Sequence, residues 1–252
     1  MKQTRIIMGM PITITLEDAH TGASDLERIF AYFRQVDETF STYKKTSEIS
    51  ALNRGDIAQD AVSPALQEIL QLAAETTSQT GGYFSIITPD GSLDPSGIVK
   101  GWAIHHAAQQ LQEQGFQDFL VNAGGDIQAS CKSGKRRHWT IGIRNPFNVK
   151  QIVQTLRITN EGIATSGSYM RGNHIYNPLA KSKQLNEVVS LSVIGPNIYE
   201  ADRFATAGFA MGREGAAFIA RLNGFAGYQI DRDGIALKTA QWTKYCKPVT
   251  TH

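Results

Sequence analysis

The sequence has few cysteines, little net charge and no long apolar run, and each absence excludes a class of protein. Two cysteines, Cys131 and Cys246, provide neither a disulfide framework nor metal-ligand spacing. The net charge of +2 is too small to favour nucleic acid as a partner, and the short basic run at 134–138 is most simply a solvated loop. No apolar stretch approaches the roughly 20 residues of a membrane span. With 252 residues, 41% hydrophobic, the chain has the composition of an ordinary globular protein with a sizeable core.

The first 16 residues show neither a secretory signal nor a lipid-attachment cysteine. They begin with a basic residue but then alternate, instead of forming an apolar core segment. We therefore expect a cytoplasmic protein from the chain as given, and an extracytoplasmic one if a signal sequence was removed.

Helical and strand patterns are mixed along the chain, with several strands in succession. Helices are predicted over 25–40, from Ser47 as a short capped helix, and over 63–80, 93–113, 200–212 and 214–223. Strands are predicted over 5–16, 118–131 (a pair), 138–146, 152–160, 162–170 and 187–195, with a closing hairpin over 226–240. Consecutive hairpin-like strands favour an α+β fold with a largely antiparallel sheet and packed helices. We expect one domain over 1–252, a single compact unit with two lobes as an option.

The stretch 93–111, LDPSGIVKGWAIHHAAQQL, is the most informative segment. It leads from a polar turn into an amphipathic helix. Gly97 lets backbone N–H groups approach an anion closely at a helix start, and Lys100 at the mouth of the helix adds a positive charge. The segment therefore predicts a phosphate-binding site.

A second block, ADRFATAGFAMG at 201–212, carries Asp202 and Thr206. Four residues apart on a helix, the two share one face, and carboxylate and hydroxyl oxygens suit magnesium. The alternative is that Asp202 is a solvated residue near a helix start and that Thr206 packs. The small, apolar neighbours favour a buried helix, in which Asp202 would need a partner. Together the two blocks suggest a divalent metal beside a phosphate.

Two further motifs leave alternatives open. Gly124-Gly125-Asp126 either brings backbone amides near a ligand or forms a tight hairpin turn. His174, in RGNHIYNP, is either a general acid or base or a histidine of a surface loop. Dinucleotide and P-loop fingerprints are missing, and so is the nucleophile elbow of a hydrolase.

Seven blocks, taken in order, resemble the ApbE family of FAD:protein FMN transferases over almost the whole chain. The blocks are IIMGMPITI, VDETFSTYKKTSEISALN, TGGYFSIITP, LDPSGIVKGWAIH, FLVNAGGDIQA, IATSGSYMRGNHIYNP and EADRFATAGFAMG. Each is weak alone, but seven in the right order are specific. The resemblance implies an ApbE-like, T-fold-like α+β domain that moves FMN from FAD onto a threonine or serine of an acceptor flavoprotein and releases AMP.

The resemblance also implies roles for particular residues. Catalysis would depend on His174, beside the acceptor, and on Lys100. The metal, Mg²⁺ with Mn²⁺ as an option, would be bound by Asp202, Thr206 and the Gly97 carbonyl. FAD, the substrate, would contact Met8, Tyr43, Tyr83, Phe84, Ser85, Asp94, Lys100 and Tyr176. Neither a nucleic acid nor a membrane span is expected.

The sequence departs from the family pattern at three places. Ser85 and Asn177 stand where the family usually has aspartate, and Pro95-Ser96 replaces the commoner Leu-Gly. Fewer carboxylates are expected to weaken metal or flavin binding. Two alternatives to transfer therefore stay open, an FAD pyrophosphatase that yields FMN and AMP and a protein that binds FAD without turnover.

Overall fold

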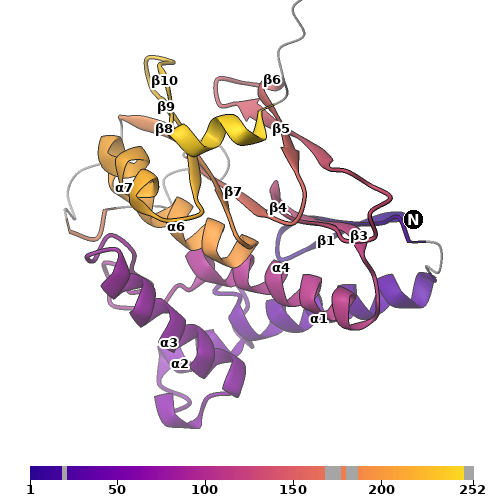
Figure 1. The fold of residues 1–252 in the computed structure, drawn as a ribbon. Helices are drawn as coiled ribbons and strands as arrows, with labels where there is room; N and C mark the ends of the chain where they lie inside the picture. Colours follow the sequence, from indigo (N-terminus) through magenta and orange to yellow (C-terminus); the bar gives the residue numbers. More distant parts are fainter. Residues whose placement is uncertain (19–21, 168–176, 180–186, 247–252) are drawn as a thin grey trace, which may run out of the picture.

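The computed structural model describes residues 1–18, 22–167, 177–179 and 187–246 (Figure 1). Its helices are α1 (Ala23–Phe40), α2 (Glu48–Arg54), α3 (Pro64–Gln79), α4 (Ser96–Glu113), α6 (Ile198–Ala210) and α7 (Gly215–Arg221), with short 3₁₀ helices η1 (Gln59–Ala61), η2 (Gly212–Glu214) and η3 (Ala240–Tyr245). Its strands are β1 (Lys2–Ile7), β2 (Met10–Leu16), β3 (Asp118–Ala123), β4 (Asp126–Cys131), β5 (Trp139–Asn145), β6 (Asn148–Ile158), β7 (Gly162–Gly167), β8 (Val188–Gly195), β9 (Ala226–Asp231) and β10 (Ala236–Lys238).

Eight strands form one sheet in the order β1-β2-β3-β4-β7-β8-β9-β10, and β5 and β6 form a separate two-stranded sheet. Every neighbouring pair is antiparallel. Short turns join β1 to β2, β3 to β4 and β9 to β10, whereas helices lie between β2 and β3 and between β8 and β9, and the β5–β6 hairpin lies between β4 and β7. The predicted α+β class with a largely antiparallel sheet is confirmed. The expectation of a single domain over 1–252 stays a prediction.

The large sheet separates two hydrophobic clusters. One face packs against the helices, with α1, α4, α6 and α7 in contact with its strands (Figure 1). The opposite face is covered by the β5–β6 hairpin and η3, whose buried Trp139 and Trp242 belong to the second cluster. The alternation of side chains along each strand supplies both clusters at once.

The prediction of one strand over 5–16 is wrong, because the segment is a hairpin. Met8 and Gly9 both have positive φ, 55° and 68°, which is the backbone of a two-residue turn whose twist matches the flanking strands. The pairing Ile7↔Met10 closes it. Gly9 was the available signal, but methionine is an unusual first turn residue and the apolar pattern runs through it.

Helix α4 differs from its prediction in two respects. It begins at Ser96, so Lys100 lies one turn inside the helix and not at its mouth. The helix is also buried on most sides, with Val99, Ala103 and Ile104 among its inaccessible residues, because α1, α6 and the sheet surround it. The caps predicted at Ser47 and Ser63 are confirmed, since each side chain accepts a hydrogen bond from its helix.

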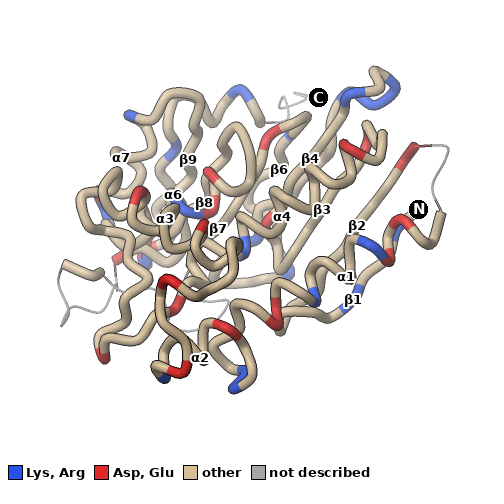
Figure 2. The backbone as a smooth tube through the Cα atoms, turned by 90° about the horizontal axis from the view of Figure 1, so that it is seen from below, with Lys and Arg blue, Asp and Glu red and all other residues tan. Residues whose placement is uncertain are grey.

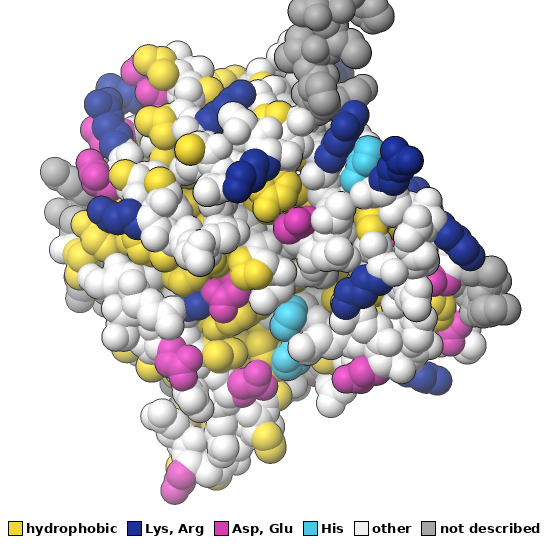
Figure 3. All heavy atoms as spheres, viewed as in Figure 1, with side chains coloured by type: hydrophobic (Ala, Val, Ile, Leu, Met, Phe, Trp, Pro, Cys, Tyr) yellow, Lys and Arg dark blue, Asp and Glu magenta, His cyan; other side chains and the backbone are white. Residues whose placement is uncertain are grey.

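Charge is distributed unevenly over the two sides. Acidic residues are prominent on α1, α2 and α3 (Figure 2), whereas basic side chains are spread across the upper half of Figure 3. Among the helices within the described ranges, none combines the length and the apolarity needed to cross a bilayer.

Candidate functional site

Helices α4 and α6 pack closely beside Gly101, and this crossing positions the candidate site. A Cβ atom on Gly101 would lie 2.6 Å from the Cβ of Asp202 and 2.9 Å from the carbonyl oxygen of Ile198, so a larger residue does not fit. The Gly101 N–H donates to Oδ2 of Asp202 at 2.8 Å. The start of α6 also presses on β7, where a Cβ on Gly162 would lie 2.0 Å from the Ile198 nitrogen. Close packing on both sides therefore determines where the Asp202 carboxylate lies.

Asp202, Lys100 and Asp126 form a charged triad. The Lys100 ammonium nitrogen is 2.5 Å from Oδ2 of Asp126 and 3.4 Å from Oδ1 of Asp202, whose side chains are 4% and 3% exposed. Burial raises the pKa of Asp202; Lys100 and the Gly101 N–H act against this increase, and the charge of Asp126 adds to it. With all three groups ionised, the triad carries one excess negative charge. A buried excess charge favours a cation as partner.

Two neutral oxygens lie beside the triad. The Thr206 hydroxyl, one turn after Asp202 in α6, donates to the Gly97 carbonyl over 3.4 Å. Carboxylate, hydroxyl and carbonyl oxygens are hard ligands that suit Mg²⁺, which completes its shell with water and substrate phosphates. The residues therefore fit magnesium. Within the described residues no group of three or more His, Cys, Asp or Glu could bind a metal, so substrate oxygens would have to supply part of the shell.

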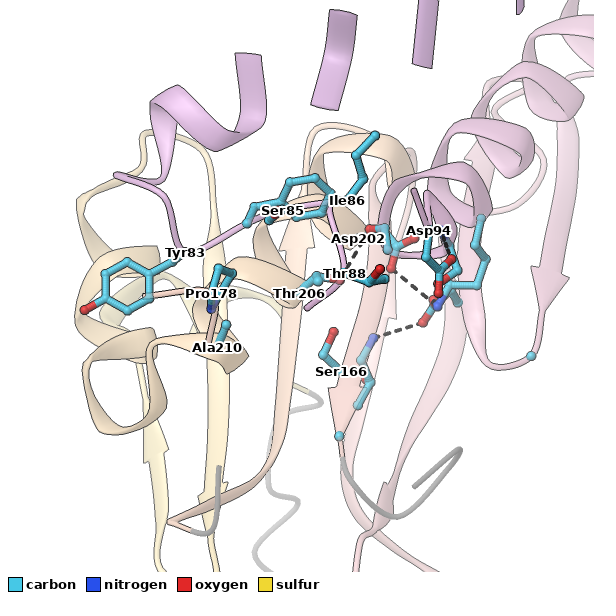
Figure 4. A pocket seen from close by; sticks show the side chains of 18 residues that line it. Tyr83, Ser85, Ile86, Thr88, Asp94, Ser166, Pro178, Asp202, Thr206 and Ala210 are labelled. Carbon is cyan, nitrogen blue, oxygen red and sulfur yellow. Dashed lines mark hydrogen bonds and ion pairs between the residues drawn. The ribbon is translucent and has the colours of Figure 1, made fainter. Parts of the chain in front are cut away.

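A pocket brings these groups together with the segment 83–88, and its enclosed volume is about 130 Å³. Figure 4 shows an elongated arrangement, with Tyr83 near Pro178 and Ala210 at one end and Asp202, Asp94 and Thr88 at the other. Ligand sites for drug-sized molecules usually measure roughly 300–1,000 Å³. The enclosed part is thus large enough for a phosphate group but not for a whole dinucleotide.

The structure unites eight of the residues predicted from sequence. The pocket is lined by Tyr83, Phe84, Ser85, Asp94, Gly97, Lys100, Asp202 and Thr206. Phe84 is only 2% exposed, so its ring supports the wall and offers little surface for stacking.

Four other predicted residues are not placed at this pocket. Met8 occupies the β1–β2 turn, and Tyr43 follows α1 with 97% of its surface exposed; neither lines the pocket. His174 and Tyr176 lie outside the described residues, so their predicted roles stay predictions.

The expected anion site at the start of α4 is partly occupied by protein groups. Oδ1 of Asp94 accepts a hydrogen bond from the Ser96 N–H at 3.0 Å, and Lys100 is offset by two carboxylates. The positive potential predicted for this helix start is therefore weaker than the residues alone suggest, and the region instead favours a cation.

The three departures from the family pattern have local structural roles. The Ser85 hydroxyl accepts from the Ile87 N–H at 3.0 Å, and the Asn177 side-chain oxygen accepts from the Leu179 N–H at 2.9 Å. Each needs an acceptor oxygen and not a negative charge, so serine and asparagine serve these turns. Pro95 caps α4 through its carbonyl, which accepts from the N–H groups of Ile98 and Val99.

Asp126 is the site residue that the sequence analysis left out of its site. The Gly124-Gly125 turn is a tight hairpin, as one alternative proposed, but it also delivers Asp126 into the pocket. Oδ1 of Asp126 accepts from the Thr165 N–H at 2.9 Å while Oδ2 pairs with Lys100. A carboxylate directly after two glycines at a strand start was the signal.

Comparison with known proteins decides the family. The sequence model of the ApbE family matches residues 8–89 and 86–228. This chain belongs to the ApbE family. The FAD:protein FMN transferase of Klebsiella pneumoniae (strain 342) is 30% identical over 202 residues, which cover 73% of this chain and 58% of that protein. The enzyme of the same name from Escherichia coli (strain K12) is 31% identical over 166 residues, covering 62% of this chain and 47% of that protein. The chain thus matches about half the length of these ApbE relatives.

Solved ApbE structures share the fold. The flavin transferase ApbE from Vibrio cholerae superposes with a TM-score of 0.83 at 22% identity, covering 97% of this chain and 98% of that chain. The ApbE protein from Thermotoga maritima gives 0.86 at 17% identity, covering 98% and 99%. The predicted ApbE-like fold is confirmed.

Proposed function

We propose that this ApbE chain transfers FMN from FAD to a threonine or serine hydroxyl of an acceptor flavoprotein and releases AMP. The observation that carries the proposal is the charged triad at the α4–α6 crossing, next to the Gly97 and Thr206 oxygens. With Asp202 ionised, the excess negative charge of the triad attracts a divalent cation, and a cation there attracts a pyrophosphate. The ApbE relatives in Klebsiella and Escherichia carry the name of this activity.

The reaction breaks the phosphoanhydride bond of FAD and forms a phosphate ester bond to the acceptor. The acceptor oxygen bonds to the FMN phosphorus, the bond from that phosphorus to the bridging oxygen breaks, AMP leaves with the bridging oxygen, and the hydroxyl proton goes to a base. Bound Mg²⁺ would neutralise charge on the pyrophosphate and the leaving AMP. Asp202, Thr206 and Gly97 would bind the metal, and Lys100, directed by Asp126, would face the phosphates. We assign the base to His174 on the family resemblance.

The test is incubation with FAD, MgCl₂ and a panel of purified flavoprotein domains, followed by chromatography for AMP and intact-mass spectrometry. AMP that appears only with an acceptor, together with covalent FMN on that acceptor, supports transfer. AMP without an acceptor means hydrolysis by water, and retained FAD without AMP means binding alone; either result contradicts the proposal. Replacing MgCl₂ by MnCl₂ compares the two candidate metals.

The role of His174 has a separate test. His174→Ala is expected to slow transfer and to leave the Kd for FAD near its wild-type value, because proton removal is a property of the chemical step. Loss of FAD binding would instead make His174 a binding or structural residue. Isothermal titration with FAD and single-turnover transfer separate these results.

A further inference from the structure

A second cavity, of about 680 Å³, lies on the face of the sheet opposite the helices, under the β5–β6 hairpin. One wall is the face of the large sheet, because its lining residues alternate along the strands: Pro11 and Thr13 in β2, Leu120 and Asn122 in β3, Ile163 and Thr165 in β7. We call this cavity the hairpin groove.

The other wall of the hairpin groove is the edge of β5. Five consecutive residues, Thr140 to Arg144, line it. Successive side chains of a strand point to opposite faces, so a cavity that touches five in a row runs along the backbone edge. Within the part of the chain that the structure describes, β5 pairs with β6 alone, which leaves this edge without a partner strand. An open edge is a template for adding an extended segment.

The hairpin groove continues into the candidate site. Gly124, Asp126 and Thr165 line both cavities, and Asp126 carries the ion pair with Lys100. The strands β4 and β7 pair only through Ile127↔Ile163 and Gln128↔Gly162, so they are unpaired beyond Ile127 on the side of Asp126. A segment in the groove therefore reaches the pocket at the point where the triad begins.

Two charged residues, Asp126 and Arg144, line the groove, and because Asp126 is paired with Lys100, an acidic side chain of the occupant would pair with Arg144. Between Ile127 and Asn160 the sequence contains seven basic residues and no aspartate or glutamate: Lys132, Lys135, Arg136, Arg137, Arg144, Lys150 and Arg157. Arg144 lines the groove and is exposed. Such a positive field attracts an acidic partner and raises its rate of association.

We propose that the hairpin groove binds the acceptor protein, as an extended segment that adds to the edge of β5, presents its hydroxyl at the Asp126 end and places acidic side chains near Arg144. This inference rests on the proposed function. The groove performs no chemistry; it positions the hydroxyl whose transfer reaction is given above.

The variants Arg144→Glu and Thr140→Trp test the groove, the first by charge and the second by volume. Both residues are exposed, so neither substitution disturbs the core. Arg157→Glu is the matched control, because Arg157 is an exposed arginine that pairs with Thr140 in the hairpin but does not line the groove. The probe is the flavoprotein domain that gains FMN with the wild-type protein.

Both groove variants are expected to raise the KM for this acceptor by at least about tenfold, equivalent to about 1.4 kcal/mol, while Arg157→Glu changes it by less than about threefold. The Kd for FAD should stay at the wild-type value in all three. A wild-type KM in the groove variants overturns the inference. So does an equal loss in Arg157→Glu, which would mean general charge attraction, or a weakened Kd for FAD, which would place part of FAD in the groove.

A peptide copy of the acceptor segment tests strand addition directly. It should compete with the acceptor, and backbone N-methylation at alternate residues should abolish competition in one register and spare it in the other, because only one set of N–H groups faces β5. Equal effects in both registers overturn strand addition. If the wild-type protein flavinylates no domain of the panel, both the proposed function and this inference are wrong. If it flavinylates one, the proposed function holds, and the groove variants then test the inference by itself.

Discussion

The two faces of the large sheet differ in how they are packed and in how their charges are arranged. On the helical face, α4 and α6 meet with no space for a Cβ at Gly101, and the buried carboxylates of Asp126 and Asp202 surround Lys100. On the hairpin face, β5 offers an open edge over a cavity of about 680 Å³, and the charges from 127 to 160 are all positive. On the helical face a few charged side chains are buried and closely packed. On the hairpin face the backbone edge of β5 and the charged side chain of Arg144 are accessible.

This difference suggests that the helical face carries out the reaction and that the hairpin face binds the acceptor. A reacting group must be held within a fraction of an ångström, which close helix packing provides, whereas a partner segment needs unsatisfied backbone groups and a long-range field. Asp126 belongs to both, because it lies where the two cavities meet. Substitutions on the helical face should therefore change turnover, and those on the hairpin face should change the KM for the acceptor.

The largest expected effect is that of Asp202→Asn. The amide keeps the shape and can still accept from the Gly101 N–H, but it removes the charge that would bind the metal. We expect AMP release to fall by about 10²–10³-fold, the scale of losing one strong electrostatic contact in a transition state. The measurement is single-turnover AMP formation with saturating FAD and MgCl₂.

Glu200→Gln is the control for Asp202→Asn, since Glu200 lies on α6 but pairs with Arg203 away from the pocket. Wild-type AMP release in Asp202→Asn would contradict the assignment of Asp202 as a metal ligand. A raised KM for the acceptor with unchanged turnover in Asp202→Asn would contradict the proposed difference between the two faces.

Asp126→Asn has the next largest expected effect. Asp126 is a positioning residue, because it directs the Lys100 ammonium and accepts from the Thr165 N–H. Without the charge of Asp126, Lys100 loses the shorter of these two ion pairs and keeps the one with Asp202, so we expect turnover to fall by roughly tenfold or more, with the loss of one charge-assisted contact. We also expect the KM for the acceptor to rise. Asp126→Asn should therefore change both turnover and this KM, whereas Asp202→Asn should change turnover alone and Arg144→Glu should change KM alone. Full kcat and KM measurements test this, and unchanged values for both would make Asp126 a structural residue only.

The sequence predicts the helices well and places Asp202 and Thr206 on one helix face, but it does not predict the relations that depend on packing. Asp202 and Thr206 share a face because their spacing matches a helical turn, which is a local property. Lys100 between Asp126 and Asp202 depends on contacts across 26 and 102 positions, which periodicity does not encode. The β1–β2 turn was missed because Met8 continues the apolar pattern through a positive φ. The open edge of the groove could not be predicted, because only the three-dimensional pairing shows that β5 has β6 as its one neighbour among the strands of the described residues.

Gly101→Ala tests how tightly the helical face is packed. The new methyl group would lie within 3 Å of Asp202 and the Ile198 carbonyl, and overpacking of this kind costs about 1–3 kcal/mol. For a chain of this size each kcal/mol lowers Tm by about 2–4 °C. Gln109→Ala, on an exposed position of the same helix, is the control and should keep the wild-type Tm. A wild-type Tm in Gly101→Ala, measured by calorimetry, would show that the crossing can expand and that packing does not position Asp202.

The smallest expected effect concerns two histidines of the helical face, which should affect the pH dependence of stability but not the rate of AMP release. His105 and His106 of α4 are half-buried and do not line the pocket, and burial is the main cause that lowers the pKa of each below the ordinary 6.5. Between that lowered pKa and 6.5 the unfolded chain binds more protons than the folded one, so the free energy of unfolding falls as the pH decreases through this window.

The double variant His105→Gln, His106→Gln should therefore lose less Tm than the wild type between pH 7.5 and pH 5.5, because the carboxylates other than Glu68, which lies beside His106, contribute equally to both proteins and cancel in the comparison. Its AMP release at pH 7.5 should match the wild type, since neither imidazole reaches the triad. Parallel Tm curves would show that the two histidines titrate alike in the folded and unfolded chains. A loss of activity at pH 7.5 would mean that α4 transmits changes along its length, so that the precision of the site depends on the whole helix and not on the Gly101 crossing alone.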